Sequence, residues 1–181
     1  MKIYLLRHQE RESGHKFSIP LSTNGQKLAQ TKTLHTLRRL GITQVYSSPF
    51  YRVLQTLDPF VKSVQKPIKI EYALYEYLNP NLFSKETPVW GPAEEWYHKF
   101  LIDPSYQSVV SPHELKMGLE EFTNVQDRLR KFLNYLYQKY GSSQETILIA
   151  SHQFILEQIL EMTGHPAQNI SYQTGQVIQL I

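Results

Sequence analysis

The chain has 181 residues and a formal net charge of +3, and its 41% hydrophobic and 19% charged residues are typical of a globular protein with one core. It has no cysteine, which excludes disulfide bonds, thiol catalysis and cysteine-ligated metal sites. No signal peptide, membrane span or nucleic-acid-binding motif is predicted. We therefore expect one cytoplasmic domain over residues 1–181 that contacts neither membranes nor nucleic acids, and the sequence leaves its oligomeric state open.

Short β-prone segments alternate with amphipathic helical segments along most of the chain. In chain order the predicted elements are a strand at 2–6, a helix at 22–40, a strand at 42–47, a helix at 49–64, a strand at 67–71, a short helix at 93–101, a long helix at 122–140, a strand at 146–150, a helix at 153–164 and a final strand at 176–180. Ser22 is a good N-cap for the first helix, and Pro59 is expected to kink or interrupt the second. This alternation predicts a layered α/β domain.

The regular pattern is lost between residues 72 and 118, where five prolines divide the chain and tyrosine and tryptophan are frequent. A long irregular insertion in a compact domain is typical of a lid or a substrate-binding segment, so this one is expected to cap the active site. A loosely ordered connection is the alternative. The aromatic residues of the insertion would line a pocket in the first case and pack the insertion itself in the second.

Basic and imidazole side chains follow three of the predicted strands. Arg7 and His8 end the first strand, His152 comes just after the strand at 146–150, and Arg52 lies in the first turn of the helix after a third strand. Because the carboxyl ends of parallel strands meet at one edge of a sheet, we expect these side chains to converge. A guanidinium suits an anion, and an imidazole suits a nucleophile or a proton-transfer group. A buried structural histidine and an ordinary surface arginine are the alternatives.

Five segments carry a recognisable pattern in this order: Leu6-Arg7-His8-Gln9-Glu10, Leu21-Ser22-Thr23-Asn24-Gly25, Tyr46-Ser47-Ser48-Pro49-Phe50-Tyr51-Arg52-Val53-Leu54-Gln55-Thr56, Leu74-Tyr75-Glu76 and Ser151-His152-Gln153. They resemble the motifs of the histidine phosphatase superfamily, also called the phosphoglycerate-mutase-like family. The third segment is the most specific and the fourth the weakest. The resemblance implies a three-layer α/β/α sandwich with a mostly parallel central sheet and helices on both faces.

The resemblance also implies phosphoryl transfer through a phosphohistidine. A neutral nitrogen of His8 would attack phosphorus, while Arg7 and Arg52 hold the equatorial oxygens. His152 would stabilise the charge that accumulates in the transition state. Glu76 is the candidate general acid, which protonates the leaving alcohol and then accepts a proton from the attacking water. Neither a metal ion nor a cofactor is implied.

Two further phosphate-binding candidates are Ser22, at a helix start, and Gln153, next to the second histidine. Glu71 is the substitute for Glu76 if the weakest motif is misaligned. Superfamily motifs have glycine where this chain has Gln9 and Gln153. If those positions need positive φ, glutamine costs on the order of 1 kcal/mol. If their backbone is ordinary, the two amides point into or beside the pocket and change the choice of substrate.

The leading hypothesis is a metal-independent phosphatase that acts on a small phosphorylated substrate or a phosphoprotein. A phosphoglycerate-mutase-type phosphotransferase is the close alternative, although such mutases are similar to longer chains with a larger insertion. A third hypothesis is a catalytically weak, phosphatase-like module that binds phosphorylated partners. The paired histidines and arginines favour an enzyme, because binding alone needs no nucleophile, whereas the two glutamines favour the binding module.

Overall fold

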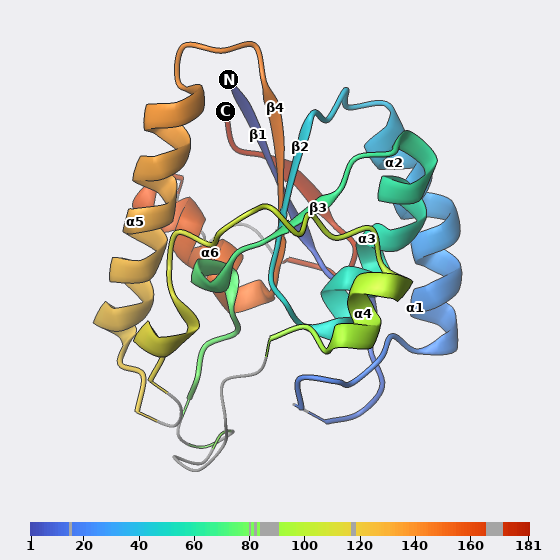
Figure 1. The fold of residues 1–181 in the computed structure, drawn as a ribbon, viewed down its shortest axis with the longest axis horizontal. Helices are drawn as coiled ribbons and strands as arrows, with labels where there is room; N and C mark the ends of the chain where they lie inside the picture. The colour runs from blue at the N-terminus through green and yellow to red at the C-terminus, as the bar shows by residue number, and fades with distance from the viewer. Residues whose placement is uncertain (15, 80, 82, 84–90, 117–118, 166–171) are drawn as a thin grey trace.

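The computed structural model describes residues 1–14, 16–79, 81, 83, 91–116, 119–165 and 172–181. At its centre lies a five-stranded sheet with the strand order β3-β2-β4-β1-β5 (Figure 1). The strands are β1 Lys2–Arg7, β2 Gln44–Ser47, β3 Ile68–Ile70, β4 Thr146–Ser151 and β5 Val177–Gln179. The first four are parallel to one another, and β5 runs antiparallel to β1 at the edge. The predicted mostly parallel sheet is confirmed.

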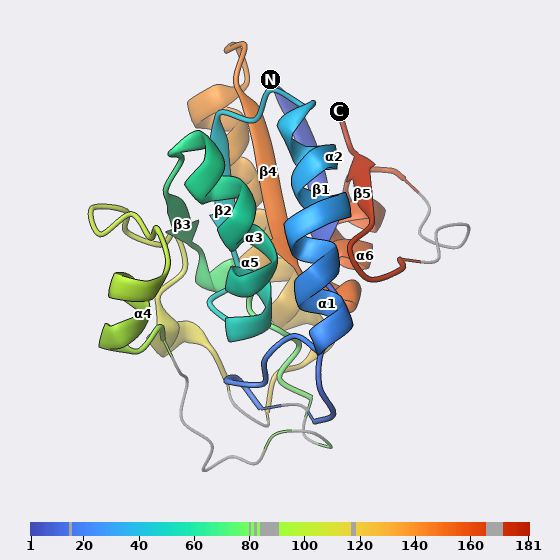
Figure 2. The same cartoon turned by 90° about the vertical axis from the view of Figure 1, so that its right-hand side faces the viewer.

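Helices cover both faces of the sheet, as Figures 1 and 2 show. They are α1 Thr23–Leu28, a π-helical turn η1 Ala29–Thr33, α2 Leu34–Arg38, α3 Tyr51–Val64, α4 Glu94–Lys99, α5 Phe122–Tyr140 and α6 Gln153–Met162, with 3₁₀ turns η2 Tyr72–Leu74 and η3 Pro112–Glu114. The helices α1 to α3 lie on one face, and α5 and α6 lie on the other. The predicted three-layer α/β/α sandwich is therefore confirmed. No helix in the described part of the chain is long and apolar enough to cross a membrane.

Strand β4 shows why the sheet is buried on both faces. Leu148 and Ala150 pack into the core beneath α2 and α3, whereas Ile147 and Ile149 pack into the core beneath α5 and α6. Every residue of the strand is buried. Successive side chains of a strand point to opposite faces, so a strand covered on both sides is apolar at successive positions, as Ile147 to Ala150 are.

Two helices differ from their predicted form. The helix expected from residue 22 to 40 begins at Thr23, with Ser22 as its N-cap, but is divided into α1, η1 and α2. The π-helical turn faces the buried side chain of Gln9, which bonds Thr33 within it. The expected interruption at Pro59 does not occur, and α3 continues to Val64. Phe60 and Val61, directly after this proline, are buried in the core, and tertiary packing of this kind outweighs local propensity.

The insertion at 72–118 is anchored by Glu71, which is fully buried. Its carboxylate accepts five hydrogen bonds from chain on both sides of α4: from the backbone of Ala73, Val109 and Val110 and from the hydroxyls of Tyr106 and Ser108. A carboxylate that accepts this many hydrogen bonds from the chain holds the surrounding backbone in place and does not face the pocket. The alternative that Glu71 serves as the general acid is thus wrong. That the insertion caps the active site stays a prediction, because residues 80, 82 and 84–90 lie outside the described part.

Candidate active site

Four side chains converge at the carboxyl edge of the sheet. The Nε of Arg52 lies 3.3 Å from the Nε2 of His8, and its Nη2 lies 3.1 Å from the Nδ1 of His152. The same Nη2 is 3.5 Å from the Oε2 of Glu76, which is 3.2 Å from His152 Nδ1. The two imidazole rings meet edge to face, with 5.3 Å between their centroids. The convergence expected from the strand ends is therefore present.

Local backbone geometry produces this meeting. The amide of His8 donates to the carbonyl of Ser151, which extends the β1–β4 pairing by one residue beyond β1. His152 has extended backbone angles and is the N-cap of α6, so its side chain is held at the point where strand becomes helix. Arg52 lies in the first turn of α3, where its guanidinium packs 4.5 Å from the ring of Phe50. All three side chains are at least nine-tenths buried.

His8 is held in one tautomer. Its Nδ1 lies 2.7 Å from the backbone carbonyl of Gln9. A carbonyl only accepts hydrogen bonds, so Nδ1 carries the proton and Nε2 keeps its lone pair. Burial, and then the charge of Arg52, lower the pKa of His8 to about 3. His8 is neutral at physiological pH and presents an unprotonated nitrogen to the site, as a nucleophile requires.

Glu76 has the electrostatic character of a proton donor. Burial raises the pKa of its carboxyl above the usual 4.5, and Arg52 acts in the opposite direction with a smaller effect. About a fifth of the side chain is exposed, on the side of the pocket. The arginines do not cancel the effect of burial, so the carboxyl holds its proton to higher pH than an ordinary glutamate.

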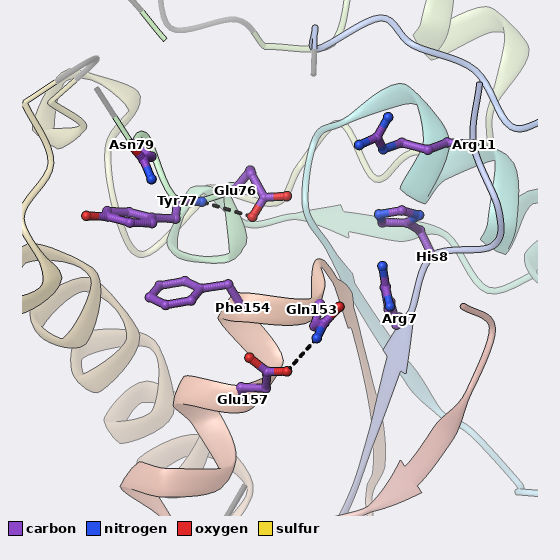
Figure 3. Close-up of a pocket in the computed structure, with 9 residues that line it drawn as sticks. All are labelled: Arg7, His8, Arg11, Glu76, Tyr77, Asn79, Gln153, Phe154 and Glu157. Atoms are coloured by element: carbon purple, nitrogen blue, oxygen red, sulfur yellow. Dashed lines mark hydrogen bonds between the residues drawn. The ribbon is translucent and has the colours of Figure 1, made fainter. Parts of the chain in front are cut away.

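A pocket of about 410 Å³ opens over these groups (Figure 3). It is lined by Arg7, His8, Arg11, Glu76, Tyr77, Asn79, Gln153, Phe154 and Glu157. Four of the predicted site residues are in this lining: Arg7, His8, Glu76 and Gln153. Arg52 and His152 are not in it, but both contact His8 and Glu76. Ser22 is not part of it, because its hydroxyl caps α1 by accepting from the amide of Gly25. Its phosphate-binding role stays a prediction that no contact supports.

The prediction did not name four of the lining residues, Arg11, Asn79, Phe154 and Glu157. Phe154 and Glu157 share one face of α6 with Gln153 at helical spacing, a pattern that the sequence contains. Arg11 lies in a loop three residues after His8, and Asn79 lies in the insertion, where no periodicity places it. Tyr77 is an aromatic residue of the insertion that does line the pocket. Arg7, which the prediction included, bonds the carbonyl of Tyr172 through Nη1, and its buried Nε has no partner among the described residues.

The two glutamines do not disturb the backbone. Gln65 is the one described residue other than glycine with positive φ, so Gln9 and Gln153 have ordinary angles. The amide of Gln9 is buried away from the pocket and donates to the hydroxyl of Thr33 at 2.6 Å. Gln153 lines the pocket, and its Nε2 donates to Glu157. Of the two readings that the sequence left open, the ordinary backbone is correct, but its expectation that both amides point into or beside the pocket is wrong for Gln9.

Gly175 makes room for Gln9. Its φ is +71°, and a Cβ placed on it would lie 1.9 Å from the Nε2 of Gln9. We expect Gly175→Ala to lower the free energy of unfolding by about 2–4 kcal/mol in urea denaturation, from the left-handed backbone and from overpacking. Gly41→Ala is the matched control, since its φ is +64° with open space around it, and should cost only about 1 kcal/mol. Pairing Gly175→Ala with Gln9→Gly should recover the difference, and failure to do so would contradict the clash.

The buried histidine also makes stability sensitive to acid. Between pH 6.5 and about 3, the unfolded chain binds a proton at His8 that the folded chain excludes. The contribution of neutral His8 to the free energy of unfolding should thus be fully present above pH 6.5. It should decrease as the pH falls, by up to about 1.4 kcal/mol for each pH unit. Burial lowers the pKa of His152 as well, which adds in the same direction. Urea denaturation of His8→Asn should give a smaller slope with pH, and equal slopes would contradict this account.

Comparison with known proteins agrees with this geometry. The profile of the histidine phosphatase superfamily (branch 1) matches residues 3–177. Comparison with curated proteins gives no match.

Solved structures of phosphatases share the fold. An ecdysone phosphate phosphatase from Bombix mori, in complex with tungstate, has a TM-score of 0.75 at 16% identity over 98% of this chain and 88% of its own. A putative alpha-ribazole-5'-P phosphatase from Escherichia coli K-12 has a TM-score of 0.60 at 25% identity over 93% of this chain and 82% of its own. A mycobacterial glucosyl-3-phosphoglycerate phosphatase has a TM-score of 0.63 at 14% identity over 98% and 88%. With its profile matched over nearly the whole chain, the protein belongs to the histidine phosphatase superfamily, branch 1.

Proposed function

We propose that this protein is a phosphatase that hydrolyses a phosphomonoester through a phosphohistidine on His8. The observation that carries the proposal is the state of this imidazole: Nδ1 is tied to a carbonyl, Nε2 is unprotonated, and the ring opens on a pocket between Arg7 and Arg11. The Nε of Arg52 donates to this Nε2 at 3.3 Å, which brings a cation to the nitrogen, and a structural histidine of the core needs no such flanking anion site. The superfamily to which the chain belongs supports the same chemistry.

The first step transfers the phosphoryl group to His8. Arg7 and Arg52 hold the phosphate oxygens, and the Nε2 of His8 forms a bond to phosphorus as the bond to the leaving oxygen breaks. The carboxyl of Glu76 gives its proton to that oxygen, so the product leaves as an alcohol. The Nδ1 of His152 accepts from the Nη2 of Arg52 at 3.1 Å, so His152 orients the guanidinium that stabilises charge on the phosphoryl oxygens.

The second step releases phosphate. Water gives a proton to the Glu76 carboxylate as its oxygen bonds to phosphorus, and the bond from phosphorus to His8 breaks. His8 returns to its neutral form and Glu76 to its protonated form, so the cycle closes without a metal ion.

A pocket of about 410 Å³ suits a small phosphorylated molecule rather than a folded phosphoprotein. We place the activity in the cytoplasm, as the sequence suggested.

The experiment is a quench of the enzyme during turnover of p-nitrophenyl phosphate. We expect release of nitrophenol, and an acid-labile, alkali-stable phosphate that mass spectrometry maps to His8. Parallel reactions with phosphoglycerates and a bisphosphoglycerate primer would expose a mutase by isomerised product. Binding of a phosphopeptide without turnover of any ester, and without phosphohistidine, would overturn the proposal in favour of the binding module.

A further inference from the structure

The pocket has two ends of different character. Arg7, Arg11 and His8 lie together at one end, which is the end for phosphate (Figure 3). At the other end the side chains of Tyr77 and Phe154 point away from His8, and Glu157 lies beside them. The leaving group of a substrate must extend from the first end toward the second, because phosphorus has to stay within reach of His8.

Tyr77 and Phe154 form an aromatic shelf. Their rings are stacked, with 4.8 Å between centroids and 22° between planes. Phe154 also meets Phe122 edge to face at 6.0 Å, which extends the apolar surface toward α5. Both shelf residues line the pocket, so one edge of this stack is available to a ligand. Aromatic surfaces of this kind bind flat, apolar rings.

Glu157 supplies a negative charge next to the shelf. One turn of α6 separates it from Gln153, whose Nε2 donates to its Oε1 at 2.8 Å. Its second carboxylate oxygen, Oε2, has no hydrogen-bond partner among the described residues, and Figure 3 shows it on the side of Phe154. A carboxylate oxygen only accepts hydrogen bonds and repels anions. This end of the pocket therefore favours a donor or a cation.

We propose that Tyr77, Phe154 and Glu157 form a leaving-group subsite for an aromatic ring that carries an ammonium or another hydrogen-bond-donating group. The inference rests on the proposed phosphatase function and narrows its substrate class. A leaving group with a carboxylate at the same position meets the charge of Glu157 and is disfavoured. Phosphorylated hydroxy acids are thus poor substrates on this account, although the arginines at the opposite end attract anions.

The test uses three aryl esters whose para substituents are of similar length and carry a positive charge, no charge or a negative charge: phosphotyramine, p-propylphenyl phosphate and the phosphate of p-hydroxyphenylpropionic acid. We expect kcat/KM to be highest for phosphotyramine and lowest for the carboxylate, with about fivefold to tenfold between them. Glu157→Gln should bring the ratio close to one. Glu161→Gln, one turn further along α6 and outside the pocket lining, should leave the ratio unchanged.

A second variant addresses the shelf. Phe154→Ala should lower kcat/KM for all three aryl esters by about tenfold relative to glycerol phosphate, whereas the exposed Tyr137→Ala on α5 should not. If Glu157→Gln changes all three esters equally, the carboxylate only balances Arg7, and the inference fails while the phosphatase function stands. If the native enzyme hydrolyses none of the esters, the proposed function fails and the inference with it.

Discussion

Replacing His8 by alanine should lower kcat for p-nitrophenyl phosphate by a factor on the order of 10³ to 10⁶, with little change in the affinity for inorganic phosphate. The variant lacks the nitrogen that would form the bond to phosphorus. Water must then attack the ester directly, without the covalent intermediate. Arg7 and Arg52 keep their positions because the first bonds a carbonyl and the second is held by His152 and Phe50. Steady-state kinetics with phosphate as a competitive inhibitor separates the two effects.

The matched control is His35→Ala. His35 is an exposed histidine on α2, far from the pocket lining, so its loss should leave kcat unchanged. The phosphoenzyme trapped on quenching should disappear in His8→Ala and persist in His35→Ala. Equal turnover in the two variants would mean that another group attacks phosphorus, and the phosphohistidine mechanism would be abandoned.

The convergence of the histidines could be predicted because it depends on topology. Apolar runs end abruptly at Arg7 and before His152, and parallel strands bring such ends to one edge of the sheet. The helix after Pro49 likewise places Arg52 one turn from the end of β2. This convergence does not depend on how the side chains pack. It needs only that the strands be parallel and adjacent, and β4 pairs with both β1 and β2.

The choice between two carboxylates depended on packing, which the sequence does not display. Glu71 and Glu76 are five residues apart, and either one could face the phosphate. Their partners in the structure differ. The carboxylate of Glu71 accepts five hydrogen bonds from the chain, whereas Glu76 lines the pocket. The direction of the Gln9 amide could not be predicted from the sequence for the same reason. It turns away from the pocket because Gly175, far along the chain, leaves room for it.

The position of Glu76 depends in turn on a buried ion pair. Arg128 of α5 donates through Nε to Glu120 at 2.8 Å, and both side chains are about 95% buried or more. The same guanidinium bonds the carbonyl of Ala73 and, at 3.4 Å, that of Glu76. Glu120 also accepts from the amide of Leu78 at 2.9 Å. The pair therefore holds the backbone on both sides of Glu76.

Arg128→Met should consequently lower the free energy of unfolding by about 3–5 kcal/mol, because it leaves the Glu120 carboxylate buried and unpaired. The backbone carbonyls of Ala73 and Glu76 also lose their donor. Urea denaturation measures the loss. Adding Glu120→Gln should recover a substantial part of it, since an amide removes the buried charge and still accepts from Leu78.

Arg130→Met is the matched control on the same helix. Arg130 pairs with Asp127 at 2.7 Å, but its side chain is 56% exposed, so its removal should cost less than about 1 kcal/mol. Two ion pairs of similar length, each made by an arginine of α5, should thus differ several-fold in their effect on stability, because burial and not distance sets the cost of breaking them. If both variants unfold at the same urea concentration, the Arg128–Glu120 pair does not hold the backbone around Glu76. The position of Glu76 would then depend on Ser151, whose hydroxyl donates to the carbonyl of Leu74 at 2.7 Å.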